Sequence, residues 1–428
     1  MDVVLVLLAV SLILFFGFFA EFIFRKISIP DVLFLIILGF VLGPHVLDIV
    51  HPDSLITIAP VFTTFTLLFL LFDGAFNINL ASLIREFSQS FVLTLFNFFV
   101  STIIVTGIML VIGMWIEGIT FLIALLTGLI LGGVSSSFAI PVLKGMRVGE
   151  KLYSLLTLES ALTDVFCIVF SLTVLEIMRL GAFGIQGTLI QISSLFAVAG
   201  LVGLIGGVVW IILVLRVFKE HNYMIAIAYL LLIYVLTEFL NGNGAIAALF
   251  FGLILKNSKQ LSSIIHGITT TKEREKKKAL KGELGVSITT PSEQFFYHQI
   301  SFFLKTFFFV YIGVLIDLSD WKALAIGGVL SLVIMLSRMG SLVLTTKMEP
   351  HNRSVVNSVF ARGLAAAAVA HLALEAGIPI AGFLVKIVYV TITGTIILSS
   401  VRVFITKRMM PETVEEIKTK VKPKARAR

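Results

Sequence analysis

The chain has 428 residues, of which 58% are hydrophobic and 14% are charged. Its mean hydropathy is +1.06. A soluble globular domain is about half apolar and about a quarter charged, so this composition excludes a soluble protein and predicts a polytopic helical membrane protein. The net charge of +8 does not indicate a nucleic-acid partner, because the basic residues follow the loops between apolar runs. The single cysteine, Cys167, cannot form an intrachain disulfide.

Thirteen apolar runs follow one another along the chain. A helix needs about 20 apolar residues to cross a bilayer core of roughly 30 Å, and most of the runs reach this length, although the ninth is short. The first run is long enough to span and has no basic segment before it, so we expect no cleavable signal peptide. The predicted spans are residues 3–24, 30–49, 55–76, 89–113, 118–142, 152–178, 187–215, 223–240, 243–255, 295–317, 323–345, 354–375 and 380–405.

The basic residues predict the orientation of these spans. When the loops are assigned alternately to the two sides, 27 of the 33 Lys and Arg residues fall on one side, three fall on the other and three lie within spans. Because basic loops mark the cytoplasmic side, we expect a multi-pass protein of the cell membrane with its amino terminus outside and its carboxyl terminus in the cytoplasm. Two polar cytoplasmic segments, residues 257–293 and the basic tail 406–428, are expected to be solvated or to contact lipid headgroups.

The span count suggests an internal repeat. Two units of six spans joined by one linker span have opposite orientations, which is the inverted-repeat plan of many secondary transporters. The fifth and twelfth spans then correspond, and both are interrupted: the fifth by glycines, the serines 135–137 and Pro141, and the twelfth by Arg362 and Gly363. Matched interruptions predict a site near the membrane midplane. The alternative interpretation is helix packing through small residues.

Two carboxylates, Glu159 and Asp164, lie inside the sixth span, where an uncompensated charge costs at least ~2.5 kcal/mol. Counted from Leu152, Asp164 is about 18 Å deep and Glu159 about 10 Å deep. Arg338 in the eleventh span lies about as deep as Glu159, which predicts a structural ion pair between them. Positions 159 and 164 point about 140° apart on a helix, so Asp164 is expected to face another surface without a basic partner.

An unpaired carboxylate near the midplane can bind a proton or a dehydrated cation, but not both at once. Hard oxygen atoms are the ligands that such a cation prefers. Competition between the two ions is sufficient for electroneutral, one-for-one antiport if the site faces one side at a time. Asp164, Ser160 and Thr163, which share one helix face, are the predicted cation ligands. The full predicted ion- and proton-binding set is Asp164, Ser160, Thr163, Ser135, Ser136 and Ser137.

Other ionisable residues are assigned lesser roles. Arg362 is expected to compensate charge at the ends of the interrupted helix. Asp73 is expected at the cytoplasmic interface, and His371 as a satisfied core residue rather than a proton relay. The sequence identifies no partner for Lys305. No nucleotide-binding, zinc or catalytic-triad pattern occurs in context, so we predict neither an enzyme nor a bound cofactor.

Four stretches resemble the monovalent cation:proton antiporter superfamily, nearest its NhaP-type and eukaryotic sodium/proton exchanger branch. Residues 29–44, with Ile-Pro and later Leu-Gly-Phe-Val-Leu-Gly-Pro, resemble the second-helix pattern of the family. The likeness covers about residues 5–405. Glu159, Ser160, Thr163 and Asp164 resemble the Glu-Ser-x-x-Asn-Asp motif of this branch. Arg338 resembles the arginine that pairs with the glutamate of that motif. Arg362 and Gly363 resemble the Arg-Gly motif of the family.

The resemblance implies an NhaA-like antiporter fold, a homodimer in the lipid bilayer and elevator-like alternating access, with Asp164 carrying the transported ions. It also implies one transmembrane unit over residues 1–405. Within that unit, the implied parts are a core bundle at about 89–178 and 323–405, dimerisation or scaffold helices at about 3–76 and 223–317, and a linker helix at about 187–215.

Two departures from the branch concern the choice of cation. Thr163 stands where the branch usually has asparagine, and residues 135–137 are serines where NhaP-type proteins often carry Thr-Asp-Pro. The second departure leaves one carboxylate fewer, so the prediction is Na⁺/H⁺ exchange with K⁺ and Li⁺ left open. The alternatives are a cation-coupled organic-anion symporter that uses Arg362 and a channel-like component. Against the symporter, the sequence has no further cluster of polar residues suited to an organic substrate. Against the channel, it has no filter-like sequence.

Overall fold

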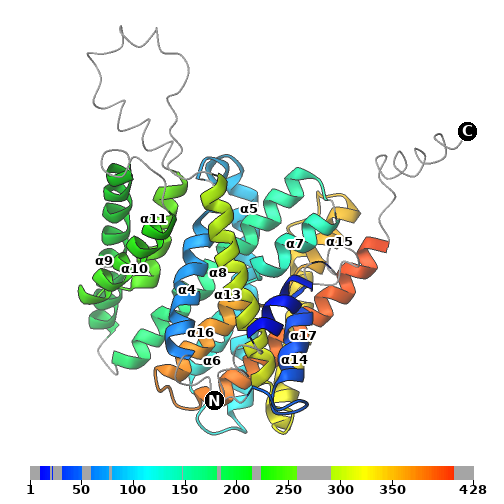
Figure 1. Ribbon diagram of the computed structural model, residues 1–428. Helices are drawn as coiled ribbons and strands as arrows, with labels where there is room; N and C mark the ends of the chain where they lie inside the picture. The colour runs from blue at the N-terminus through cyan, green and yellow to red at the C-terminus, as the bar shows by residue number, and fades with distance from the viewer. Residues whose placement is uncertain are drawn as a thin grey trace, which may run out of the picture.

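A computed structural model describes residues 10–19, 22, 31–50, 59–76, 80–146, 148–180, 185–214, 223–257 and 291–408, and all regular structure in them is helical (Figure 1). Within these residues, six helices are long and apolar enough to cross a membrane, and seven shorter apolar helices accompany them. Each of these corresponds to one of the thirteen predicted spans. The predicted fold class, an all-α polytopic membrane protein, is therefore confirmed.

The helices of the first half follow the apolar runs closely. The bounds are α2 (Asp31–Leu42), α4 (Ala59–Phe76), α5 (Leu80–Gly113), α6 (Phe121–Ile130), α7 (Ser136–Met146), α8 (Glu150–Leu180) and α9 (Ile185–Leu213).

The second half begins with a tight helical pair and ends with a long helix that is basic in its last turn. Asn243 caps the second helix of that pair, its side chain accepting a hydrogen bond from the backbone N–H of Ile246. The bounds are α10 (Tyr223–Phe239), α11 (Gly244–Lys256), α13 (Pro291–Leu315), α14 (Trp321–Arg338), the 3₁₀ helix η3 (Met339–Leu342), α15 (Pro350–Ser358), α16 (Leu364–Glu375) and α17 (Ala381–Arg408).

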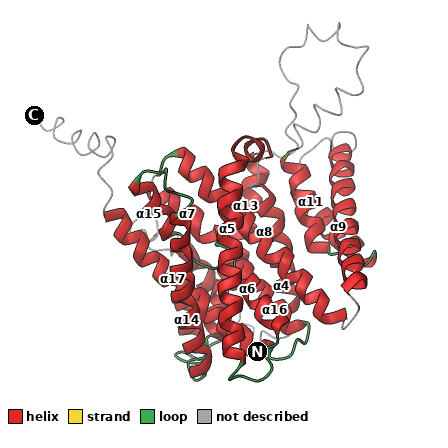
Figure 2. Ribbon diagram, turned by 180° about the vertical axis from the view of Figure 1, so that it is seen from behind, coloured by secondary structure: helices red, strands yellow, loops and turns green. Residues whose placement is uncertain are grey.

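Both interruptions predicted from the sequence are present. The fifth span is divided into α6 and α7 by the non-helical residues 131–135, and the twelfth into α15 and α16 by residues 359–363. In both views α7 and α15 lie in one half of the molecule and α6 and α16 in the other (Figures 1 and 2). The discontinuous helices therefore place four helix ends inside the protein.

The eleventh span differs from its prediction. We expected one helix over residues 323–345 with Arg338 seven residues before its end. The α-helix ends at Arg338 and continues as the 3₁₀ helix η3. The change coincides with Gly340, which has the lowest helix preference of the ordinary residues. Arg338 is therefore the last residue of α14 and lies where the α-helix passes into the 3₁₀ helix.

The helices pack as two groups. In one group α5, α6 and α8 contact one another, and α14 contacts α5 and α17. In the other, α11 contacts α4, α9 and α10, while α13 contacts α2 and α4. Helices α9–α11 form one edge of the molecule, and α14, α15 and α17 lie at the opposite edge (Figures 1 and 2). The groups meet where α4 packs against α16 and α8.

Several predicted segments lie outside the described residues. These are half of the first span, the polar loop apart from residues 257 and 291–293, and the basic tail from residue 409.

Candidate functional site

The two helix breaks contact each other directly. The backbone N–H of Ser135 in the first break donates to the carbonyl of Ala361 in the second, at 2.9 Å. Next to this bond Gly363 lies so close to Ser135 that a Cβ on the glycine would overlap the serine side chain. The breaks therefore cross at one point, and glycine is required there because of space.

Arg362 hydrogen-bonds to the first break, just beyond the end of α6. Its side chain is almost fully buried, with 2% exposed. Nη1 donates to the carbonyl of Gly133 at 2.6 Å, and Nη2 donates to Oγ of Ser101 on α5 at 3.0 Å. The carbonyl end of a helix carries partial negative charge, which a cation stabilises. Charge compensation at the ends of the interrupted helix therefore stays the predicted role of Arg362.

Thr163 also hydrogen-bonds to the backbone of the first break. Its hydroxyl accepts a hydrogen bond from the N–H of Val134 at 3.0 Å and lies within bonding distance of the carbonyls of Val134 and Ser160. A hydroxyl on α8 thus replaces the backbone bonds that α6 and α7 lose where they separate. Thr163 is fully buried and does not line the cavity described below.

Asp164 faces the beginning of α7. Its Oδ2 accepts two hydrogen bonds from Ser136, one from the backbone N–H at 3.0 Å and one from the hydroxyl at 2.6 Å. Ser136 is the first residue of α7, so the carboxylate lies at the positive end of that helix. Within the part of the chain that the structure describes, Asp164 forms no ion pair with a basic side chain.

A cavity of about 320 Å³ reaches Asp164 from one end of the helix bundle. One wall comes from α7 and α8, including Ser137 and Thr157, and the opposite wall from α4 and α13, including Ser301 and Lys305. The hydroxyl oxygens of Thr157 and Ser301 are buried and find no hydrogen-bond partner among the described residues. The cavity, called the Asp164 cavity below, therefore offers free oxygen atoms beside one carboxylate.

The predicted ligand set is only partly assembled around this cavity. Asp164, Ser136 and Ser137 line it, but Ser160 and Ser135 do not. The Ser160 hydroxyl donates to the carbonyl of Thr157 at 3.0 Å, since a serine inside a helix readily bonds back to the preceding turn. Contrary to the prediction, the side chains of Ser160, Thr163 and Ser135 therefore do not present oxygens to the cavity next to Asp164. Thr157, one turn earlier than Ser160, was missed.

Glu159 and Arg338 contact each other as expected. Arg338 donates to both oxygens of Glu159, through Nη1 to Oε1 and through Nη2 to Oε2 at 2.9 Å. Both side chains are at least 95% buried. Asn97 of α5 donates to Oε1 at 2.8 Å, and Nε of Arg338 donates to the carbonyl of Val356 at 3.0 Å. The pair joins α5, α8, α14 and α15. Asn97 went unnoticed, although an amide inside an apolar run was a usable signal.

Lys305 has a partner that the sequence did not identify. Its Nζ lies 2.6 Å from Oδ2 of Asp31, the first residue of α2, and both side chains are mostly buried. Oδ1 of Asp31 has no hydrogen-bond partner among the described residues. The two residues are far apart in sequence, so no local pattern relates them. They form a charge pair in the wall opposite Asp164.

The other two ionisable residues named above also have neighbours. Asp73 lines the Asp164 cavity and lies 3.1 Å from Nδ1 of His298 on α13. His371 lies 3.5 Å from Oε1 of Glu375 and packs edge-on against the ring of Tyr311. His371 is buried, and its Nδ1 finds no partner in the described part of the chain.

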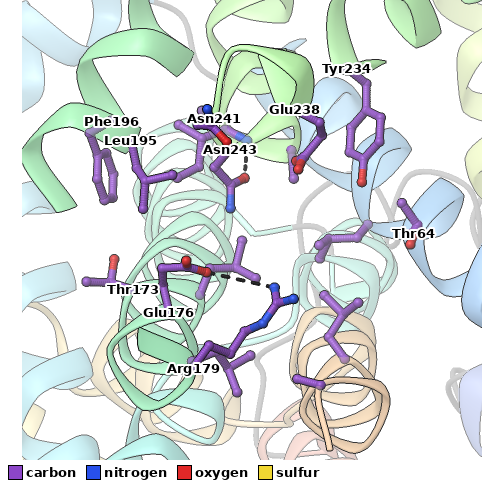
Figure 3. A pocket seen from close by; sticks show the side chains of 18 of the residues that line it. Thr64, Thr173, Glu176, Arg179, Leu195, Phe196, Tyr234, Glu238, Asn241 and Asn243 are labelled. Carbon is purple, nitrogen blue, oxygen red and sulfur yellow. Dashed lines mark hydrogen bonds and ion pairs between the residues drawn. The ribbon is translucent and has the colours of Figure 1, made fainter. Parts of the chain in front are cut away.

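A second cavity, of about 820 Å³, opens at the other end of α8 (Figure 3). Polar side chains from α8 and from the α10–α11 turn face it, including Glu176, Arg179, Glu238 and Asn243. Glu375 of α16 also lines it. We call it the glutamate cavity.

One turn of helix separates the two cavities. On α8, Ile168 lines the Asp164 cavity and Leu172 lines the glutamate cavity, and on α4 the corresponding residues are Leu71 and Leu67. Four helical residues span about 6 Å. Among the residues that the structure describes, none lines both cavities. The barrier between them is thus a thin apolar layer at the contact of the two helix groups.

The chain has relatives with named functions. It is 26% identical over 236 residues to the K(+)/H(+) antiporter NhaP2 of Shewanella oneidensis, a match that covers 54% of this chain and 40% of that protein. It is 31% identical over 235 residues to the Na(+)/H(+) antiporter ApNhaP of Aphanothece halophytica, covering 54% of this chain and 43% of that protein. The matches thus span less than half the length of these relatives.

The fold and the family agree. The structure resembles that of the sodium proton antiporter MjNhaP1 from Methanocaldococcus jannaschii with a TM-score of 0.74 and 22% identity, covering 95% of this chain and 99% of that one. This confirms the predicted antiporter-type fold. The model of the family described as "Sodium/hydrogen exchanger, transmembrane" matches residues 10–409, nearly the whole membrane region. The chain therefore belongs to the transmembrane sodium/hydrogen exchanger family, within the superfamily that its motifs resemble.

Proposed function

We propose that this protein is a secondary active transporter that exchanges a monovalent cation for a proton, with both ions competing for Asp164. The observation that carries the proposal is the contrast between the two carboxylates of α8. Glu159 is held by an arginine on both oxygens, whereas Asp164, among the described residues, receives bonds only from Ser136 and lines a cavity. A carboxylate that is exposed to a cavity inside a membrane protein, without a basic partner, suits a transported ion.

The proposed cation ligands are oxygen atoms at the end of the Asp164 cavity. The carboxylate of Asp164 and the hydroxyls of Ser136, Ser137 and Thr157 are hard ligands of the kind that alkali cations prefer. Ser160, Thr163 and Ser135 are assigned a supporting role, because their polar groups bond to backbone or are buried away from the cavity. A proton on Asp164 would remove the negative charge that attracts the cation, and this makes binding of the two ions exclusive.

The two cavities support alternating access. With the orientation predicted from the basic loops, the Asp164 cavity would open to the cytoplasm and the glutamate cavity to the outer side of the cell membrane, so we assign this conformation as inward-facing. The group that contains α5–α8 and α14–α17 is the proposed moving core. The group that contains α2, α4, α10, α11 and α13 is the proposed scaffold, through which two copies form a homodimer, with α9 as linker. A shift of the core past the apolar layer at Leu67 and Leu172 would expose Asp164 to the other side.

Sodium is the proposed cation and potassium is the second candidate. The relatives named above include one Na(+)/H(+) antiporter and one K(+)/H(+) antiporter, which match this chain over similar lengths. One carboxylate without a basic partner carries one charge for either ion, so the proposed exchange is one for one. A change in membrane potential would then leave the rate unaltered.

Reconstitution into liposomes that enclose a pH dye tests the proposal. Addition of Na⁺, Li⁺ or K⁺ should move protons with the wild-type protein, and the cation that does so at the lowest concentration is the substrate. Asp164→Asn should abolish the movement, because an amide cannot take up a proton. Glu117→Gln, which neutralises an exposed carboxylate in a loop, is the matched control and should transport normally. Full activity in Asp164→Asn would refute the proposal, and a rate that follows the potential would refute one-for-one exchange.

A further inference from the structure

A third cavity lies away from the transport site, between η3, α15 and α17. Its volume is about 270 Å³. Two arginines, Arg353 of α15 and Arg402 of α17, line it together with Ser354 and Asn357, and no carboxylate among the described residues does. The cavity therefore concentrates positive charge from two helices that are distant in sequence, and we call it the arginine pocket.

Neither guanidinium has a partner in the described part of the chain. No ion pair or hydrogen bond joins the side chain of Arg353 or Arg402 to any described residue, and Nε of Arg353 is buried without an acceptor. Glu349, one turn before Arg353, is exposed and forms no ion pair with it. A buried N–H without an acceptor is rare in native proteins and calls for a ligand or water.

The polar neighbours of the arginines are already engaged. The Ser354 hydroxyl is 3.1 Å from Oγ1 of Thr406, and the side chain of Asn357 bonds to Ser341 and to the carbonyl of Arg353. These bonds fix the pocket walls, so the free donors that point to a ligand are those of the two arginines. The amino end of α15, nine residues long, begins at Pro350 in the same wall and adds the positive end of a helix dipole.

We infer that the arginine pocket binds a phosphate group, either as free inorganic phosphate or as the headgroup of an anionic phospholipid. Two guanidinium forks and a helix amino end match the tetrahedral array of phosphate oxygens. By the proposed orientation, on which this inference rests, the pocket lies at the cytoplasmic surface of the membrane. Anionic lipids and free phosphate both occur there.

A bound phosphate would link α15 to α17. Helix α15 leads directly to the second break, and its Val356 carbonyl already holds Arg338. Phosphate would thus stabilise the half-helix that carries one side of the transport site, without touching Asp164. The expected result is a more stable protein in the presence of the ligand, by mass action.

Thermal unfolding of the purified full-length chain tests the inference. The midpoint should rise and saturate with sodium phosphate, compared with sodium chloride at equal ionic strength, or should rise in nanodiscs that contain phosphatidylglycerol compared with phosphatidylcholine alone. Arg353→Gln and Arg402→Gln should each weaken the apparent affinity about tenfold or more, since each removes a charged donor. Lys347→Gln removes one exposed positive charge from the same end of the molecule outside the pocket, and should respond like wild type.

The results distinguish free phosphate from lipid phosphate, and both from the absence of a phosphate site. A response to inorganic phosphate assigns the pocket to free phosphate, and a response to phosphatidylglycerol alone assigns it to lipid. Equal effects of phosphate and chloride together with equal effects of the two kinds of nanodisc, or a response retained when both arginines are replaced, would overturn the inference. Because the readout is unfolding rather than transport, Asp164→Asn protein should respond like wild type. A failed transport assay would therefore leave this result standing.

Discussion

At the scale of single residues, the protein treats two acids on one helix in opposite ways. Glu159 and Asp164 lie five positions apart on α8 and therefore face different neighbours. Glu159 faces α5 and α14, where Asn97 and Arg338 satisfy its oxygens. Asp164 faces the start of α7 and a cavity. A buried charge pair is costly to break, whereas a carboxylate at a cavity can change its ligand, so only the second suits transport.

The Glu159–Arg338 pair should behave as one structural unit. Glu159→Gln or Arg338→Gln leaves one buried charge without its partner and should cost about 3–5 kcal/mol of stability. The double variant should lose less than the sum of the two single losses, because it leaves no charge unpaired. Thermal unfolding of the three variants in detergent measures the coupling. Additive losses would mean that the two side chains do not depend on each other.

The Lys305–Asp31 pair provides a second case, on the scaffold side of the cavity. Lys305→Met should destabilise the protein, because Asp31 is 4% exposed and would remain charged without a partner. Adding Asp31→Asn should restore much of the loss, about 1–3 kcal/mol. Urea-induced unfolding and transport rate should be followed together. If the double variant is as unstable as Lys305→Met, the contact contributes nothing to the fold.

At the scale of secondary-structure elements, the two broken helices complete each other. Residues 131–135 and 359–363 lose their helical hydrogen bonds, and side chains from other helices replace many of them. Thr163 bonds Val134, Arg362 bonds Gly133, and Thr395 accepts from the N–H of Arg362 at 3.1 Å. Irregular backbone inside a membrane protein is stable only where protein or a cavity satisfies it. The side chains that hydrogen-bond to the breaks therefore stabilise them as much as their glycines do.

The crossing point of the breaks should not tolerate even one methyl group. Gly363→Ala would press a Cβ into Ser135 and should cost about 1–3 kcal/mol, with loss of transport. Gly328→Ala is the matched control on α14, where nothing lies within 4 Å of the new Cβ, and it should be neutral or slightly stabilising. Unfolding midpoints and liposome transport decide the comparison. Equal behaviour of the two variants would contradict the close contact.

At the scale of the whole molecule, two groups of helices enclose two cavities that do not connect. The Asp164 cavity and the glutamate cavity lie between the same two groups, on opposite sides of a layer one helical turn thick. Because the apolar layer is thin, a small displacement of one helix group against the other is enough to bring the layer from one side of the bound ion to the other. This arrangement, rather than any single residue, is what makes exchange between two compartments feasible.

Accessibility to a thiol reagent should report the two sides separately. In the conformation described here, Ser137→Cys should react with a membrane-impermeant maleimide only from the cytoplasmic side, and Thr173→Cys only from outside, because each lines one cavity. The native Cys167 is 1% exposed and gives the background in unmodified protein. Inside-out and right-side-out vesicles provide the two directions. Reaction of both variants from the same side would contradict the assignment of the cavities.

The number of spans, the two interruptions and the pairing of Glu159 with Arg338 could all be predicted from the amino-acid sequence. These follow from hydropathy, from glycine and serine in apolar runs and from the depth of a charge along a helix, all of which are local or one-dimensional properties. Only the tertiary structure decided that Ser160 and Thr163 bond to backbone while Ser136 and Thr157 line the cavity, and that Lys305 meets Asp31. The reason is physical: the rotation of one helix against another and the shape of the space between them arise from packing across the whole chain. No window of sequence contains that information.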